Sequence, residues 1–125
     1  MIMNLIEALQ IKDMQITISG YQATMQLGTF HEQPFGYLNG GAVLAFGEIT
    51  AGQASNLLGK RQYHAVGQSV SGNHMRAMKA EGRLYAKAEL LHKGQRSHVW
   101  NIRMEDECGR LISMVVVTNA LVRNL

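Results

Sequence analysis

The sequence has little of several residue types, and each scarcity excludes a class of protein. Its 125 residues include one cysteine, Cys108, which excludes an intrachain disulfide and fits a reducing compartment. No apolar run reaches the roughly 18–20 residues that a membrane helix needs. The first ten residues lack a basic segment and carry Glu7 within their apolar stretch, which argues against a secretory signal peptide. We therefore expect a cytoplasmic protein without a membrane partner.

Aromatic residues are also few, at 6% of the chain, and only 17% of the residues are charged. The net charge of +3 is mild, but eight of the twelve Lys and Arg residues fall between Arg76 and Arg110. Such a basic half-chain indicates either an anionic partner or a solvated sheet face. Because aromatic residues do not interleave with the basic ones, as a base-stacking surface requires, we expect no nucleic-acid partner.

Three kinds of catalytic site are missing from the pattern as well. The five histidines show no spacing typical of a zinc site, so we expect no metal. The sequence contains no Gly-x-Ser-x-Gly elbow of a serine hydrolase. Cys108 directly follows three acidic residues, which are the wrong surroundings for a nucleophilic thiolate.

The chain does contain a regular series of helix and strand signals, which we assign to one domain over residues 1–125. Apolar residues at helical spacing predict a short helix over 2–9 and one long helix over 41–58. Alternating residues predict a hairpin over 14–18 and 21–27, followed by strands over 63–75, 83–91, 97–105 and 111–121. The last strand is apolar enough to be central. This order predicts an α+β domain with one antiparallel sheet.

The long helix is apolar nearly all round and rich in Ala and Gly, which predicts a buried helix wrapped by a curved sheet. Glu48 is its only acidic residue. A carboxylate in an apolar cleft is costly unless it is paired or functional, so Glu48 is a candidate general base. The alternatives are an exposed strip shared with Gln53 or Asn56, or a pairing with a basic residue.

The start of this helix is the second candidate feature. Asn39 is suited to cap the helix, and the N–H groups of Gly40 and Gly41 then point outward at the positive end of the helix dipole. Such an end can polarise a carbonyl oxygen, as in an oxyanion hole. A plain capped turn remains the commoner explanation of the two glycines alone.

Taken together, these residues resemble the hotdog-fold acyl-CoA thioesterases, in the branch that includes 4-hydroxybenzoyl-CoA, 1,4-dihydroxy-2-naphthoyl-CoA and phenylacetate-pathway thioesterases. The resemblance covers about residues 15–121. Four ordered segments carry it: Gln33-Pro-Phe-Gly-x-Leu-Asn-Gly-Gly-Ala-x(5)-Glu48, Gly67-x(6)-His74-x-Arg76, Leu91-His92-x-Gly94-x-Arg96 and Val99-Trp100.

The resemblance implies a fold, a reaction and a set of site residues. The fold is a curved antiparallel sheet wrapped around a long central helix. Glu48 attacks the thioester carbon or activates a water, the Gly40 N–H polarises the carbonyl, and Gln33 and Asn39 assist. Neither a metal nor a separate cofactor is used, since coenzyme A enters as part of the substrate. The residues expected at the coenzyme A and substrate end are Gly67, His74, Met75, Arg76, Ala77, His92, Lys93, Gly94, Arg96 and Ser97.

Two positions depart from the resembled family. Relatives often have His where this chain has Asn39, and some have Ser or Thr one turn after the glutamate, where this chain has Gly52. The second departure leaves open which residue holds the attacking water. Two other functions on the same fold also stay open: an acyl-thioester hydratase or dehydratase, for which Asn39 is a poor proton donor, and an acyl-CoA binding protein without activity.

The spacing of Gly40 and Glu48 predicts a site between two subunits. Eight residues of helix span roughly 12 Å, whereas general-base catalysis requires contacts of about 3 Å. One carbonyl group therefore cannot easily touch both residues of one chain. We expect a dimer with two equivalent sites, which the resemblance extends to a dimer of dimers.

Overall fold

The structure is a computed structural model of the whole chain, and it describes residues 3–18 and 20–123. Within these residues, two α-helices and six strands follow one another. They are α1 (Leu5–Ala8), β1 (Ile11–Thr17), β2 (Gly20–Gln26), a 3₁₀ turn η1 (Thr29–His31), α2 (Gly40–Gly59), β3 (His64–His74), β4 (Arg83–Lys93), β5 (Ser97–Glu105) and β6 (Leu111–Val122).

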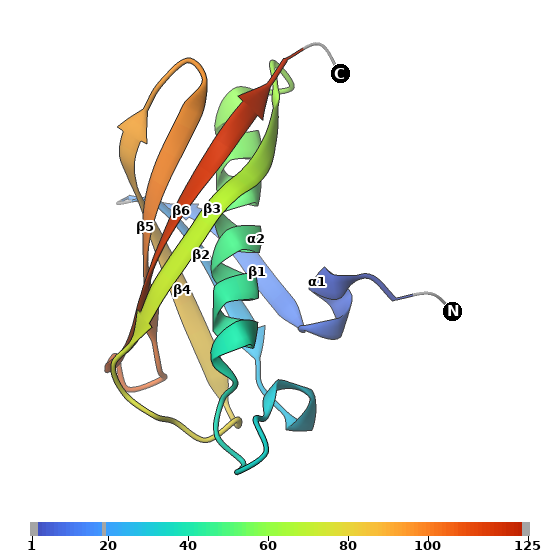
Figure 1. Cartoon of the computed structure of the whole chain (residues 1–125), viewed down its shortest axis with the longest axis vertical. Coiled ribbons are helices and arrows are strands. Elements are labelled where there is room, and N and C mark those ends of the chain that lie inside the picture. The colour runs from blue at the N-terminus through green and yellow to red at the C-terminus, as the bar shows by residue number, and fades with distance from the viewer. Residues whose placement is uncertain (1–2, 19, 124–125) are drawn as a thin grey trace.

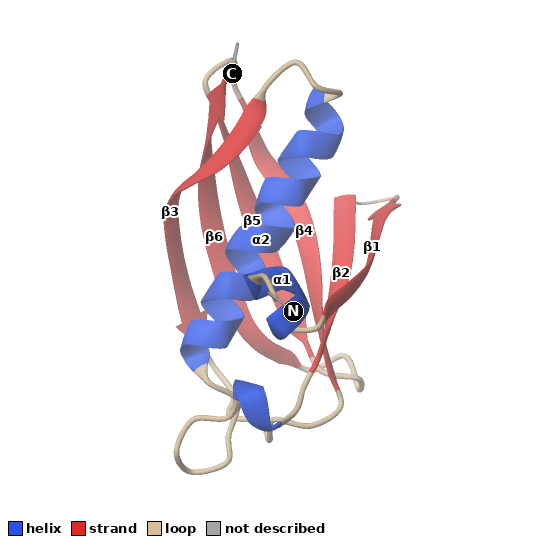
Figure 2. Ribbon diagram, turned by 90° about the vertical axis from the view of Figure 1, so that its right-hand side faces the viewer, coloured by secondary structure: helices blue, strands red, loops and turns tan. Residues whose placement is uncertain are grey.

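The six strands form one antiparallel sheet in the order β1-β2-β4-β5-β6-β3. The sheet curves, and α2 lies along its concave face (Figure 1). Seen from the helix side, α2 crosses the strands diagonally and the sheet extends on both sides of it (Figure 2). The strand β3 therefore forms one edge of the sheet, next to α2, and β1 forms the other. This is the α+β arrangement that the sequence predicts.

Most predicted boundaries are close to those of the structure. The strand predicted over 97–105 is β5, and the predicted long helix is one residue longer at each end. The strand predicted to be central is β6, which is paired on both sides but lies next to the edge strand. The helix predicted over 2–9 is shorter in the structure, and its first residue, Ile2, lies outside the described part of the chain.

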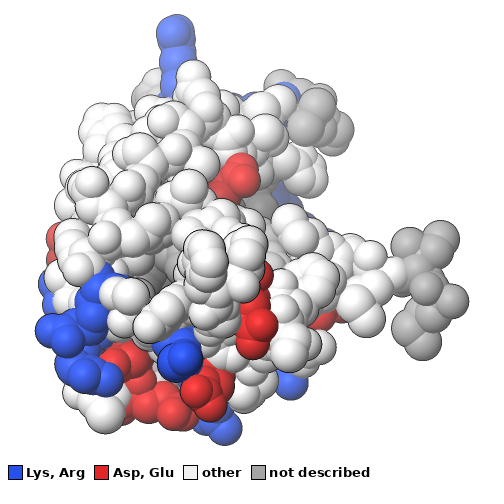
Figure 3. Space-filling view, turned by 60° about the horizontal axis from the view of Figure 1, so that its bottom comes forward, with Lys and Arg blue, Asp and Glu red and all other residues white. Residues whose placement is uncertain are grey.

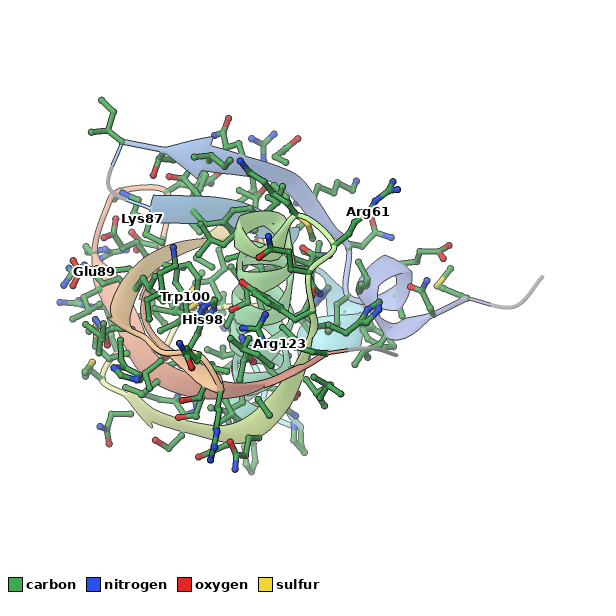
Figure 4. The ribbon with its side chains drawn as sticks, turned by 90° about the horizontal axis from the view of Figure 1, so that it is seen from above. Arg61, Lys87, Glu89, His98, Trp100 and Arg123 are labelled. Carbon is green, nitrogen blue, oxygen red and sulfur yellow. The ribbon has the colours of Figure 1, made fainter. Side chains whose placement is uncertain are left out.

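The core between α2 and the sheet is mainly apolar, and a polar cluster lies within it around Ser55. The Ser55 hydroxyl oxygen lies 2.8 Å from both His98 Nδ1 and Trp100 Nε1, and 3.1 Å from Asn119 Nδ2. All four side chains are buried. Viewed along the helix, His98 and Trp100 lie between the curved sheet and α2 (Figure 4). Burial, together with the nearby charges of Lys93 and His92, lowers the pKa of His98 below its usual 6.5.

Candidate active site

The N-terminus of α2 presents free hydrogen-bond donors. As predicted, Asn39 caps the helix: its Oδ1 accepts a hydrogen bond of 2.8 Å from the Gly41 N–H. The Gly40 N–H has no partner among residues 3–18 and 20–123. Because the Asn39 oxygen is occupied by the cap, its amide nitrogen remains available to donate. The first turn of the helix, at the positive end of its dipole, therefore offers two donors, the Gly40 N–H and the Asn39 amide nitrogen.

Gln33 lies in the loop between η1 and α2, and its orientation is fixed by the loop itself. Its Oε1 accepts hydrogen bonds from the backbone N–H groups of Phe35, at 2.5 Å, and Tyr37, at 3.2 Å. With both lone pairs of the oxygen engaged, the side chain has only its Nε2 hydrogens to offer to a ligand. Gln33 is thus a third donor that can serve a carbonyl oxygen.

His74, at the end of β3, lies directly against Gly40. A Cβ atom at position 40 would be 2.7 Å from His74 Nε2, so only glycine fits there without a shift of the ring. His74 Nδ1 lies 2.8 Å from the hydroxyl oxygen of Ser113, which is fully buried on β6. This bond holds the ring with Nε2 toward the helix start. Ser113 was missed at the sequence level, because only the pairing of β3 with β6 brings it beside His74.

A pocket of about 300 Å³ opens at this end of α2. It brings together six of the predicted residues, and it adds a hydrophobic wall that the sequence did not identify. Its lining consists of Gln33, Tyr37, Leu38, Gly40, Val43, His74, Met75, Arg76, Ala77, Met78, Ile112 and Ser113.

Glu48 does not line this pocket, and the prediction that it is buried is wrong for the single chain. The sheet covers only one side of α2. Glu48 is therefore exposed, on the side of α2 toward the edge strand β3. Leu57 and Leu58 of α2 are also 49% and 43% exposed. The carboxylate lies over Gly67 of β3: a Cβ atom there would be 2.1 Å from Glu48 Oε2. A side chain at position 67 would displace the carboxylate, which gives the predicted Gly67 a clear physical role.

The two predicted basic segments lie at opposite ends of the sheet. His74 is paired with Ser113, near the pocket, whereas Ser97 is paired with Ala120, which is also the partner of Val66 near the start of β3. Within the described residues, Arg76, Lys93 and Arg96 form no ion pair. At the end that carries the pocket, basic and acidic groups are mixed along one side and much of the remaining surface is uncharged (Figure 3).

Two further findings concern the described part of the chain. It contains no group of three or more His, Cys, Asp or Glu residues placed to hold a metal ion. None of its helices is long and apolar enough to cross a membrane.

Comparison with known proteins identifies relatives along most of the chain. The model of the thioesterase superfamily matches residues 35–113. The 1,4-dihydroxy-2-naphthoyl-CoA hydrolase of Escherichia coli is 34% identical over 94% of this chain and 86% of its own length. The proofreading thioesterase EntH of Cronobacter turicensis is 35% identical over 85% of this chain and 77% of its own.

Solved structures give the same result for the fold. A structure from Lactococcus lactis, provisionally described as a thioesterase, superposes with a TM-score of 0.94 at 48% identity, covering 98% of this chain and all of the other. A variant of the Pseudomonas aeruginosa thioesterase PA1618 superposes with a TM-score of 0.89 at 31% identity, over 96% of this chain and 86% of its own. The chain belongs to the thioesterase superfamily and is a thioester hydrolase of the hotdog fold.

Proposed function

We propose that the enzyme hydrolyses acyl-CoA thioesters at two equivalent sites across a dimer, each built from Glu48 of one subunit and the partner's Gly40. The observation that carries this proposal is the position of both residues against one strand. Glu48 lies over Gly67 and Gly40 lies against His74, near the two ends of β3. Because β3 is an edge strand with nearly all of its residues exposed, a second copy can pair with it.

For this pairing we propose a register that opposes inward residues to inward residues and also sets His74 beside the partner's Gly67. The residues of β3 that face α2 are those paired with buried β6 residues, namely Ala65, Gly67, Val70, Gly72 and His74. An antiparallel pair with Ser71 opposite the partner's Ser71 places Gly72 opposite the partner's Val70, so inward residues meet inward residues. His74 then meets the partner's β3 at its bulge, beside the partner's Gly67. Glu48 of each chain is thereby brought to the other chain's helix start.

This arrangement supports a simple division of the chemistry. The thioester carbonyl oxygen accepts hydrogen bonds from the Gly40 N–H and from Gln33 of one subunit, which stabilise the oxyanion that forms. Glu48 of the other subunit attacks the carbonyl carbon or takes the proton of the attacking water. The C–S bond then breaks, and coenzyme A leaves as the thiolate and takes up a proton. After a direct attack by Glu48, water then hydrolyses the acyl anhydride on Glu48 and releases the acid.

The basic residues suit the phosphates of coenzyme A in the same arrangement. The two-fold axis places one subunit's Arg76 at the same end of the assembly as the partner's Lys93 and the partner's Arg96. Since none of the three is ion-paired within the described residues, their charges remain available to phosphate groups.

The function is tested with a panel of acyl-CoA thioesters, including benzoyl-CoA and octanoyl-CoA, assayed for release of free thiol. We expect turnover of at least one aromatic or medium-chain member. Hydrolysis of none of them would contradict the proposed substrate class.

The dimer is tested by a cross-link at its two-fold axis. In a Cys108→Ser background, Ser71→Cys places two thiols on directly opposed residues of an antiparallel pair, whose Cα atoms lie about 4.5–5.5 Å apart. We expect mild oxidation to convert the protein to a covalent dimer, measured by non-reducing gel electrophoresis.

Ser69→Cys in the same background is the matched control. It changes the same residue type on the same face of β3, but in the proposed register it lies opposite the partner's Asn73 and away from its own copy. We expect little covalent dimer from it. Equal cross-linking of both variants, or of neither, would contradict the register.

A further inference from the structure

The amide of Asn119 is held in one orientation by the polar cluster in the core. Its Nδ2 donates to the Ala51 carbonyl oxygen and to the Ser55 hydroxyl oxygen, each at 3.1 Å. Trp100 Nε1 also donates to Ser55, which fills both lone pairs of that oxygen, so the Ser55 proton goes to His98 Nδ1. A flipped amide would set its oxygen against the Ala51 carbonyl and a hydroxyl with no proton to spare. The amide orientation is therefore fixed.

This orientation leaves Asn119 Oδ1 as an uncommitted acceptor. Asn119 is fully buried, and its Oδ1 has no hydrogen-bond partner among the residues that the structure describes. A buried amide oxygen without a donor is costly. The atom therefore calls for a donor from outside the protein.

The position of Asn119 connects this acceptor to Glu48. Asn119 is the cross-strand partner of Gly67, and both face α2. Directly opposed residues have Cβ positions about 4.5–5.5 Å apart, and Glu48 Oε2 lies 2.1 Å from where the Gly67 Cβ would be. Ala51, which holds the Asn119 amide, is one turn further along the same helix. The Asn119 side chain thus occupies the sheet position next to the Glu48 carboxylate.

We propose that Asn119 is a further residue of the active site, whose Oδ1 accepts a hydrogen bond from the water that Glu48 activates. This inference rests on the proposed function. A nucleophilic water needs acceptors for both of its hydrogens, so that a lone pair points at the carbonyl carbon. Glu48 accepts one hydrogen and receives that proton as the C–O bond forms, while Asn119 accepts the other. The thiolate of coenzyme A leaves when the C–S bond breaks.

Few other groups near Glu48 could accept the second hydrogen of the attacking water. The residue one turn after it on α2 is Gly52, which has no side chain, and no described atom outside its own helix segment lies within 4 Å of where its Cβ would be. Thr50 is fully buried and its hydroxyl donates to the Phe46 carbonyl. Within the proposed site, Ser55, His98 and Trp100 are positioning residues that act through Asn119.

The test is steady-state kinetics of Asn119→Ala with the best thioester of the panel. Loss of one hydrogen bond to the attacking water should lower kcat about 10- to 100-fold, with KM changed less than about twofold because the thioester itself is not touched. Ser55→Ala keeps Asn119 but removes one bond that orients it, so we expect a smaller loss of the same kind. Thr50→Val removes a buried hydroxyl of the same helix and should keep the wild-type kcat.

Combination with Glu48→Gln separates this role from a purely structural one. Once Glu48 is unable to activate water, Asn119→Ala should lower kcat little further. If Asn119→Ala instead caused a structural defect, the double variant would show the product of the two single-variant reductions in kcat. An unchanged kcat in Asn119→Ala, multiplied losses in the double variant, or an equal loss in Thr50→Val would overturn the inference. If the wild type hydrolyses thioesters and Glu48→Gln does not, such a result leaves the proposed function intact. A wild type that hydrolyses none overturns both.

Discussion

Glu48→Gln should lower kcat for acyl-CoA hydrolysis by about 10²- to 10⁴-fold, the usual contribution of a general base. Glutamine keeps the shape of the side chain over Gly67, so the fold and the contact with β3 are retained. The amide nitrogen can neither take a proton from water nor attack the thioester. Because the proposed contacts to the phosphates of coenzyme A come from basic residues and not from Glu48, KM should change little. The measurement is free-thiol release under steady-state conditions, together with coenzyme A binding by calorimetry.

Glu89→Gln is the matched control for this prediction. Glu89 is an exposed glutamate of β4 that lies on the outer side of the sheet, away from α2 (Figure 4). We expect wild-type kinetics from it. If Glu48→Gln retained full turnover, Glu48 would have no role in catalysis. Retained coenzyme A binding without any turnover in the wild type would favour the binding-protein alternative.

Much of the fold could be predicted because its signals are local. The alternation of residues in β5 and the small apolar residues of α2 define their elements without any tertiary information. The sequence left open whether Glu48 lies in an apolar cleft or on an exposed strip, because helix composition does not show how far a sheet reaches around the helix. The apolar girth of α2 indicates a covered helix, but six strands cover one side only. The uncovered side adjoins the edge strand β3.

The residues of the candidate site also differ in whether the sequence could identify them. Asn39 and Gly40 could be identified because helix capping is a local pattern. Ser113 and Asn119 could not, because nothing local distinguishes the polar residues of the mostly apolar strand β6, and only the pairing of β6 with β3 places them beside His74 and Gly67. Sequence reasoning therefore finds groups that lie on one helix or loop, and it misses their partners from the sheet.

Mixing two inactive variants should restore activity if each site is shared between subunits. Gly40→Pro removes the N–H of the first helical residue, where proline is well tolerated, and Asn39 already has the extended backbone that must precede proline, with φ −73° and ψ 126°. Loss of one oxyanion donor should lower kcat about 10²- to 10³-fold. Gly40→Ala introduces the same Cβ against His74 but keeps the N–H. It therefore measures the reduction in kcat that a shift of the His74 ring causes by itself.

In a heterodimer of Glu48→Gln with Gly40→Pro, one site carries both changes and the other carries neither. Random exchange makes half of the dimers mixed, so about one quarter of all sites regain the wild-type composition. Activity of the mixture should therefore rise to about one quarter of the wild-type value after co-refolding of equal amounts, far above the sum of the parents. If Glu48 and Gly40 acted within one chain, every site in the mixture would carry one defect, and the activity would stay at the average of the two parents. Only a site shared between subunits allows recovery.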